Sequence, residues 1–186
     1  TSTATLYASH RSGPWFADGS ATVGWLTGTT TRDLRAIPGT GIAGGSLGGY
    51  VGGASVLAGY RFSGATWSIE PAIGLDYAGA FVNDVVETGS AIGGLAVRGS
   101  GFDSLRATAG ARFIASAPVG AGMASVDLRL RYARELLSTV PALTASFIGD
   151  PAGGFTTLGA TGGRDLLLVG AGIGYSPNAA TRLFVR

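Results

Sequence analysis

The chain has 186 residues, of which 33 are glycine and none is cysteine, and only 13% are charged, about half the share typical of soluble proteins. The 13 basic residues are all arginines and are dispersed among 11 acidic residues, for a net charge of +2, so no basic patch suited to a nucleic acid is visible. Hydrophobic residues make up 46% of the chain. No apolar run is long enough for a transmembrane helix, and recurrent glycine disfavours helices. These features favour one β-rich domain.

The first predicted strands alternate apolar residues with small or polar ones, which is the period of a β-strand. Residues 17–29 place Ala21, Val23 and Trp25 on one face. Residues 47–62 continue the pattern, with the larger side chains at even positions: Tyr50, Ala54, Val56, Ala58, Tyr60 and Phe62.

The stretch WSIEPAIGLDY at 67–77 shows the alternation most clearly. Its odd positions are apolar, with aromatic residues at both ends, and its even positions carry Glu70 and Asp76. Three further alternating segments follow, at 102–116, 126–135 and 165–175. Charged residues of the strands from 67 to 135 are predicted to share one face: Glu70, Asp76, Arg106, Arg112, Asp127, Arg129, Arg131 and Glu135. Aromatic residues near strand ends are predicted to lie on the opposite face: Trp67, Tyr77, Phe102, Phe113, Tyr132 and Tyr175.

The predicted connections alternate between short and long. The short ones lie at 13–17, 63–66, 118–122 and 176–180, and the long ones at roughly 31–46, 82–101 and 136–163. Tight turns at one rim and long loops at the other are typical of up-and-down outer-membrane barrels.

Two environments explain an apolar face opposite a charged one. A soluble sheet would turn the apolar face toward a core, whereas a transmembrane barrel would turn it toward lipid and the charges toward a wet lumen. The connection rhythm, together with mixed charges on three consecutive strands that can pair with one another, favours an all-β, antiparallel, up-and-down transmembrane β-barrel. The aromatic residues would then be lipid-facing, and the charged ones would line the lumen.

Motifs for other chemistry are weak. The GTGIAGG stretch at 39–45 matches G-x-G-x-x-G, but Pro38 precedes it and no helix pattern follows, so it is interpreted as a flexible surface loop. His10 is the only histidine and is interpreted as a strand-end residue, so no metal site and no cofactor are predicted. Glu70 and Asp76 lie six residues apart, about 20 Å in a strand. An acid–base pair needs roughly 5–10 Å, so no enzymatic activity is predicted.

The arginines at 129, 131 and 134 leave two interpretations open. They could bind an anion, or they could form a ladder of ion pairs with Asp127 and Glu135. Their placement on alternate faces favours the ladder.

The chain resembles the C-terminal β-barrel translocator domain of autotransporters, the type V protein secretion systems of Gram-negative bacteria. Seven stretches carry the resemblance in order, over essentially the whole chain: GPWFADGSATVGW (13–25), AGYRF (58–62), WSIEPAIGLDY (67–77), FDSLRATAGARF (102–113), LRYARELL (130–137), LTASFIGDPAGGFTTLGA (143–160) and RDLLLVGAGIGYS (164–176).

This resemblance implies a barrel of 12 strands in the outer membrane, of which residues 1–186 form a single partial domain, roughly strands four to eleven. It also implies the partners: outer-membrane lipid, the barrel-assembly machinery, and an N-terminal passenger with its linker helix, both outside this chain. The expected function is export and cell-surface anchoring of that passenger. The chemistry of passenger release is expected around the linker helix, and no residue here is matched to it.

Two alternatives are carried beside this expectation. An outer-membrane diffusion channel of the porin kind would use the same barrel without a passenger. A soluble β-sandwich binding protein would bury the apolar faces between two sheets and stay soluble without detergent.

Overall fold

Strands form all the regular structure in the described part of the chain. The computed structural model describes residues 1–90, 93–137, 140–178 and 180–185. The strands are β1 (Ser2–Ser12), β2 (Trp15–Asp33), β3 (Ile42–Tyr60), β4 (Phe62–Ser63), β5 (Trp67–Val82), β6 (Val85–Val86), β7 (Leu95–Val97), β8 (Ser100–Val119), β9 (Gly122–Glu135), β10 (Ala142–Phe147), β11 (Asp150–Leu158), β12 (Asp165–Asn178) and β13 (Thr181–Val185).

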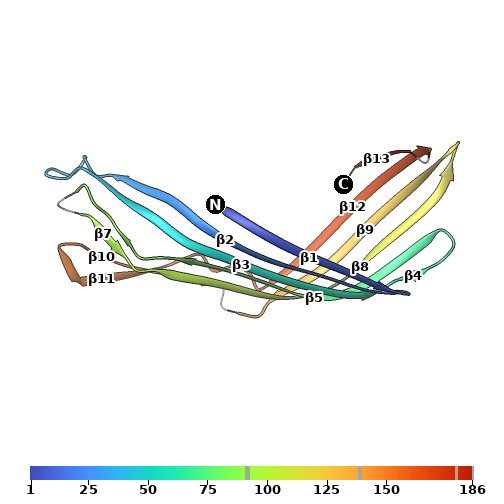
Figure 1. Ribbon diagram of the computed structural model, residues 1–186, viewed down its shortest axis with the longest axis horizontal. Coiled ribbons are helices and arrows are strands. Elements are labelled where there is room, and N and C mark those ends of the chain that lie inside the picture. The colour runs from blue at the N-terminus through green and yellow to red at the C-terminus, as the bar shows by residue number, and fades with distance from the viewer. Residues whose placement is uncertain (91–92, 138–139, 179, 186) are drawn as a thin grey trace.

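The main sheet is antiparallel throughout and follows the order β1-β2-β3-β5-β8-β9-β12-β13, with the short β4 paired to β5. It curls into a half-barrel with β1 and β13 as its border strands (Figure 1). The up-and-down topology and the all-β class predicted from the alternation are therefore confirmed. Within the described residues the sheet does not close on itself, since β1 and β13 do not pair with each other.

The two ends of the sheet differ in the way the sequence predicts. At one end the hairpins are tight, with two residues between β1 and β2 and two between β8 and β9. Gly13 and Gly120 open these turns at φ of 56° and 59°, a conformation that glycine adopts without steric cost. The long connections leave the other end, and parts of two of them pair as a second sheet in the order β11-β10-β7-β6, which lies toward the left in Figure 1.

The first of the expected long loops is shorter than predicted. The first long connection covers only residues 34–41, because β2 continues to Asp33 and β3 begins at Ile42. The interpretation of residues 39–45 as a surface loop is therefore wrong for 42–45, where Ala43 is buried and Gly44 exchanges two backbone hydrogen bonds with Thr88. Glycine-rich composition hid this strand, since glycine is usually depleted in strands.

The pairing register carries the alternation across neighbouring strands. Glu70 faces Arg112 and Asp76 faces Arg106 between β5 and β8, while Ile73 faces Ala109. The predicted charged residues therefore share one face of the sheet. The prediction for Phe102 is wrong: it pairs with Ala80 and lies on the same face as Arg106, because the two residues are four positions apart in β8.

The sheet has little hydrophobic core of its own. The buried apolar residues of the described chain are small or medium in size: Ala43, Val85, Ala133 and Ala145. The long apolar face is open instead, with Ile73 68% exposed and Val169 75% exposed. No second layer covers this face within the described residues, so the β-sandwich alternative is wrong.

Candidate functional site

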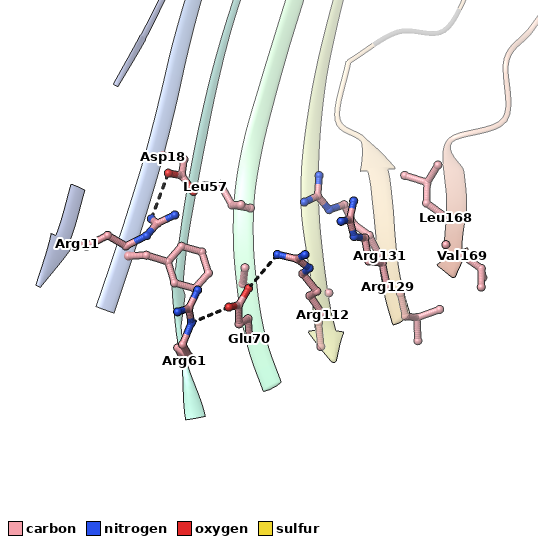
Figure 2. A pocket seen from close by; sticks show the side chains of 16 residues that line it. Arg11, Asp18, Leu57, Arg61, Glu70, Arg112, Arg129, Arg131, Leu168 and Val169 are labelled. Carbon is pink, nitrogen blue, oxygen red and sulfur yellow. Dashed lines mark hydrogen bonds and ion pairs between the residues drawn. The ribbon is translucent and has the colours of Figure 1, made fainter. Parts of the chain in front are cut away.

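The charged face is the concave one. Residues from β1, β2, β3, β5, β8, β9 and β12 line one cavity of about 520 Å³, so their side chains converge inside the curl (Figure 2). A second cavity of about 460 Å³ adjoins it and shares Asp18, Leu57 and Arg131 with the first.

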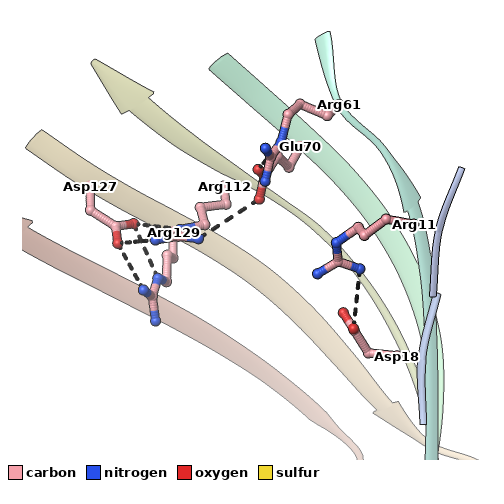
Figure 3. A network of polar contacts seen from close by, with 7 residues as sticks. All are labelled: Arg11, Asp18, Arg61, Glu70, Arg112, Asp127 and Arg129. Atoms are coloured by element: carbon pink, nitrogen blue, oxygen red, sulfur yellow. Dashed lines mark hydrogen bonds and ion pairs between the residues drawn. The ribbon is translucent and has the colours of Figure 1, made fainter. Parts of the chain in front are cut away.

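A chain of ion pairs crosses this concave face (Figure 3). Arg61 Nε donates to Glu70 Oε1 at 2.7 Å, and the other oxygen of Glu70 lies 3.8 Å from Arg112 Nη1. Arg112 and Arg129 each donate two hydrogen bonds to Asp127, with the shortest contacts at 2.7 Å. This chain of side chains links the start of β4 to β5, β8 and β9. Bidentate arginine–carboxylate contacts fix orientation as well as charge.

The first of these contacts follows from the register, which is the same on both sides of a gap in the ladder and places Arg61 opposite Glu70. The ladder is interrupted between the pairs Gly59–Ala72 and Phe62–Ile69. Pro71 lies in this gap and has no N–H to donate to a ladder. Arg61 is held instead by its own N–H, which donates to Pro14 O at 2.8 Å, and its side chain extends to Glu70.

The N-terminal border of the concave face carries a separate pair. Arg11 Nη1 lies 3.1 Å from Asp18 Oδ1, which also accepts a 2.6 Å hydrogen bond from Ser9 Oγ. The guanidinium of Arg11 covers the ring of Phe16, 4.9 Å from its centroid. None of these side chains was among the predicted lumen-facing residues, although Asp18 follows the same alternation.

A third site lies where β9 ends and the last long connection begins. Glu135 is 5% exposed and accepts hydrogen bonds from Ser104 Oγ at 2.6 Å, Leu105 N at 2.9 Å and Arg106 Nε at 3.2 Å. Leu137 N donates to it at 3.2 Å. The carboxylate thus ties the end of β9 to β8.

Glu87 is a buried, hydrogen-bonded carboxylate that was not predicted from the sequence. It is 7% exposed in the connection between β6 and β7, and it accepts hydrogen bonds from Arg32 and from Leu95 N. The hydrogen bond from Arg32 is the main reason that the pKa of Glu87 is lowered. Arg32 also donates to Gly93 O at 2.7 Å, so one arginine of β2 holds two points of this connection. Only the tertiary fold brings residues 32 and 87 together, and no sequence pattern signals it.

Two predicted charged residues have no polar side-chain partner in the described part of the chain. Asp76 lies opposite Arg106 in register, but Arg106 is bound to Glu135. Arg131 extends into both cavities and makes no ion pair with a described residue. The ladder prediction therefore holds for Arg129 with Asp127 and not for Arg131 with Glu135. Arg134 is on the opposite, convex face, where it lies 3.5 Å from Asp165.

The convex face carries the predicted aromatic residues. Register and alternation place Trp67, Tyr77, Phe113, Tyr132 and Tyr175 on this face. Further aromatic residues, of which only Trp15 and Phe81 were not named from the alternation, form two clusters there. Near the tight turns, Trp15 meets Tyr60 edge-on at 4.9 Å and Tyr60 meets Phe62 at 4.6 Å.

The second aromatic cluster lies toward the end with the long connections. Tyr50 and Phe81 stack with their ring centroids 5.2 Å apart, and Trp25 pairs with Tyr50 in register. Toward the same end, Tyr77 Oη donates a 2.5 Å hydrogen bond to Asp103, and Tyr132 Oη donates to Asp165. Apolar rings with polar tips at this level match the aromatic belts of membrane proteins.

The geometry offers little to an enzyme. The buried Glu70 lies between two arginines, and Asp127 and Glu135 are each bound by arginine, so these carboxylates are engaged in ion pairs. Among the described residues, no cluster of three His, Cys, Asp or Glu side chains could hold a metal ion. Within the same residues, no helix has the length and apolar character needed to cross a membrane.

A curled antiparallel sheet, charged inside and apolar outside, defines the class of transmembrane β-barrel proteins. Comparison with known protein families identifies the family within this class. The model of the autotransporter β-domain family matches residues 1–186, so the chain belongs to this family of translocator domains. No curated protein matches the sequence.

Proposed function

We propose that this chain is the membrane-embedded part of an autotransporter that exports an N-terminal passenger and holds it at the cell surface. One observation carries the proposal: the same strands present charged residues to the concave side and an apolar surface to the convex side. Membership in the autotransporter β-domain family supplies the translocator role. Export of a passenger and its anchoring are the inferences added here.

The convex face has the dimensions of a bilayer core. Trp67 and Tyr77 lie ten residues apart in β5, or about 33 Å along the strand. A strand tilted by about 45° would span roughly 23 Å of membrane between them, close to the ≈ 25 Å apolar band of outer-membrane barrels. The apolar residues between them on this face are Ile69, Pro71, Ile73 and Leu75. Exposure of such a surface to water would favour aggregation, which supports a need for outer-membrane lipid and the barrel-assembly machinery.

The concave face suits a hydrated lumen. Most of its arginines and carboxylates are paired across strands, so they hold the wall in shape while they interact with water. No nucleotide or cofactor is needed for this role, and we assign no catalytic step to the wall. A diffusion channel is the second candidate, because a polar concave face would serve equally well for small solutes.

Protease treatment of intact cells distinguishes these functions. The full-length protein is expressed in a Gram-negative host, the cells are treated with external protease, and the outer-membrane fraction is run on gels with and without boiling. The proposal expects loss of a large N-terminal segment and a heat-modifiable core that survives. A heat-modifiable core with no segment removed would identify a channel, and a soluble product without a heat shift would contradict both membrane functions.

A further inference from the structure

The hairpin of β10 and β11 contains the one Asp–Pro bond of the sequence, between Asp150 and Pro151. Asp150 opens β11 opposite Phe147 of β10, and its side chain is exposed. The two strands carry no other charged side chain, and Asp150 makes no ion pair with a described residue. A carboxylate that is exposed and not bound by a cation is able to act as a nucleophile.

A hydrogen bond turns the carboxylate of Asp150 toward the peptide bond that follows it. Gly153 N donates to Asp150 Oδ1 at 3.1 Å. Because this donor comes later in the chain, the side chain of Asp150 extends in the C-terminal direction, beside its own bond to Pro151. The approach is close, since a Cβ on Gly153 would collide with Asp150 Oδ2. Glycine at position 153 therefore leaves the room that this placement of the carboxylate requires.

The other carboxylate that precedes a proline in the sequence, Glu70, is placed in the opposite way. It is 8% exposed within β5, and its two oxygens face Arg61 at 2.7 Å and Arg112 at 3.8 Å. A carboxylate held by two arginines is not free to attack a neighbouring carbonyl group, and the side chain of glutamate is one methylene longer than that of aspartate. The chain thus offers one exposed acid–proline bond and one enclosed bond for comparison.

We propose that Asp150 cleaves its own peptide bond to Pro151 when the surrounding medium is acid. A carboxyl oxygen of Asp150 attacks the carbonyl carbon of the same residue, which closes a cyclic anhydride. The C–N bond breaks, and its electron pair stays on the nitrogen of Pro151, which takes a proton from the medium and leaves as a secondary amine. Water then opens the anhydride, so one water molecule is consumed for each peptide bond. Proline favours this route, because its nitrogen carries no hydrogen and cannot attack the side-chain carboxyl group to form a succinimide instead.

The cleavage opens the tip of the hairpin and releases neither piece. Pairing from Ala142–Leu158 to Ala145–Phe155 still holds β11 to β10, and β12 stays paired with β9. The product is a chain in two pieces that separate only when the protein is unfolded. This activity is independent of export, so the two can be tested apart.

Incubation of the full-length protein across a pH series tests the cleavage. Outer-membrane fractions with protease inhibitors are kept at neutral and acid pH and are then boiled and run on gels. At acid pH we expect two pieces, which mass spectrometry identifies by a C-terminus at Asp150 and an N-terminus at Pro151, while the Glu70–Pro71 bond stays intact. Asp150→Glu should slow the cleavage by about tenfold or more, because the longer side chain is a poorer intramolecular nucleophile. Pro151→Ala should slow it as well and replaces Asp150→Glu if that variant fails to assemble.

Two alanine variants test whether the fold positions the carboxylate. Gly153→Ala displaces Asp150 Oδ2 and should slow the cleavage by roughly threefold or more. Gly154→Ala is the matched control, because a Cβ there would lie 3.7 Å from Ala145 O, an ordinary contact, and it should leave the rate unchanged. Heat-modifiability reports the assembly of each variant separately. An intact chain at acid pH, a rate that Asp150→Glu and Pro151→Ala leave unchanged, or equal rates for the 153 and 154 variants would overturn the inference, and none of these results bears on export.

Discussion

The convex and concave faces of β5 differ although they come from the same strand of 16 residues. On the convex side, Ile73 is exposed and has no charged neighbour in register, because Ala58 and Ala109 flank it. On the concave side, Glu70 is buried between Arg61 and Arg112. Charge is thus absent where the strand would meet lipid and is paired where it would meet water. Neighbouring positions in the strand therefore differ in the free energy of an ionic side chain, which is unfavourable on the convex face and favourable on the concave face.

The largest difference in stability between the two faces is expected when a new arginine is placed on each of them. Ile73→Arg places a charge at the middle of the proposed lipid face and should cost on the order of 2–4 kcal/mol of folding free energy. Ala72→Arg, one residue away and lining the concave cavity, should cost less, because its charge faces water and Glu70. The free energies come from refolding titrations into lipid vesicles followed by heat-modifiability. Equal costs, or the reverse order, would contradict the assignment of the faces.

Removal of the most enclosed carboxylate tests the concave face. Glu135→Gln leaves Arg106 without its counter-ion and weakens the acceptor for Ser104 and two backbone N–H groups. We expect the free energy of unfolding to fall by about 1–3 kcal/mol. The lost ion pair with Arg106 should account for only a small part of this, because the Arg106 side chain is half exposed. Asp76→Asn is the control on the same face and should change stability by less than about 0.5 kcal/mol. An equal effect of both variants in urea titrations would show that the pairing around Glu135 stabilises nothing.

A larger side chain at Gly110 tests how closely β8 and β9 approach each other on the concave side. Gly110→Ala would bring a Cβ to within 2.3 Å of Leu130 O, so β8 and β9 must shift, at a cost of about 1–2 kcal/mol. Gly28→Ala is the control, because a Cβ there meets no atom within 4 Å. It should be neutral or slightly stabilising, as alanine restricts the unfolded chain. If thermal unfolding finds the two variants equally stable, the close approach at Gly110 is not a constraint.

The smallest expected effect is a local dependence on pH at the long connections. Hydrogen bonding from Arg32 lowers the pKa of Glu87 below its ordinary value of 4.5. The pair therefore contributes fully above that ordinary value, and its contribution is lost as the pH falls through the lowered pKa. Hydrogen exchange at Leu95, whose N–H is bonded to Glu87, should accelerate relative to other strands at acid pH. Glu87→Gln should remove this acid-induced change, and an unaltered pH profile in that variant would contradict the role of the carboxylate.

The sequence predicts the faces of the strands far better than the contacts on them. Period-two alternation is enough to place Glu70 and Arg112 on one face, because the pairing from β1 to β12 has no register shift. It cannot choose partners: Asp76 lies opposite Arg106, yet Arg106 turns to Glu135, which Ser104 and two backbone N–H groups already fix in place.

The long connections were the least predictable part of the chain. Residues 142–158 form β10 and β11 in a sheet with β6 and β7. β6 and β7 have only two and three residues, and β11 contains a proline and two adjacent glycines, residue types that are depleted in strands. The contact between Arg32 and Glu87 spans 55 residues and depends on how that segment folds back. Phe102 lies near a strand end, where aromatic residues typically face lipid, but its spacing of four positions from Arg106 places it on the concave face.

Site-directed spin labelling along β5 tests the central claim most directly. The chain has no cysteine, so single cysteines at Ser68, Ile69, Ala72, Ile73, Leu75 and Asp76 can each carry one nitroxide label. In the full-length protein reconstituted into bilayers, the account predicts that labels at 69, 73 and 75 collide mainly with oxygen dissolved in lipid. Labels at 68, 72 and 76 should collide mainly with a water-soluble paramagnetic reagent. Accessibility without this two-residue period, or with the opposite phase, would contradict the account.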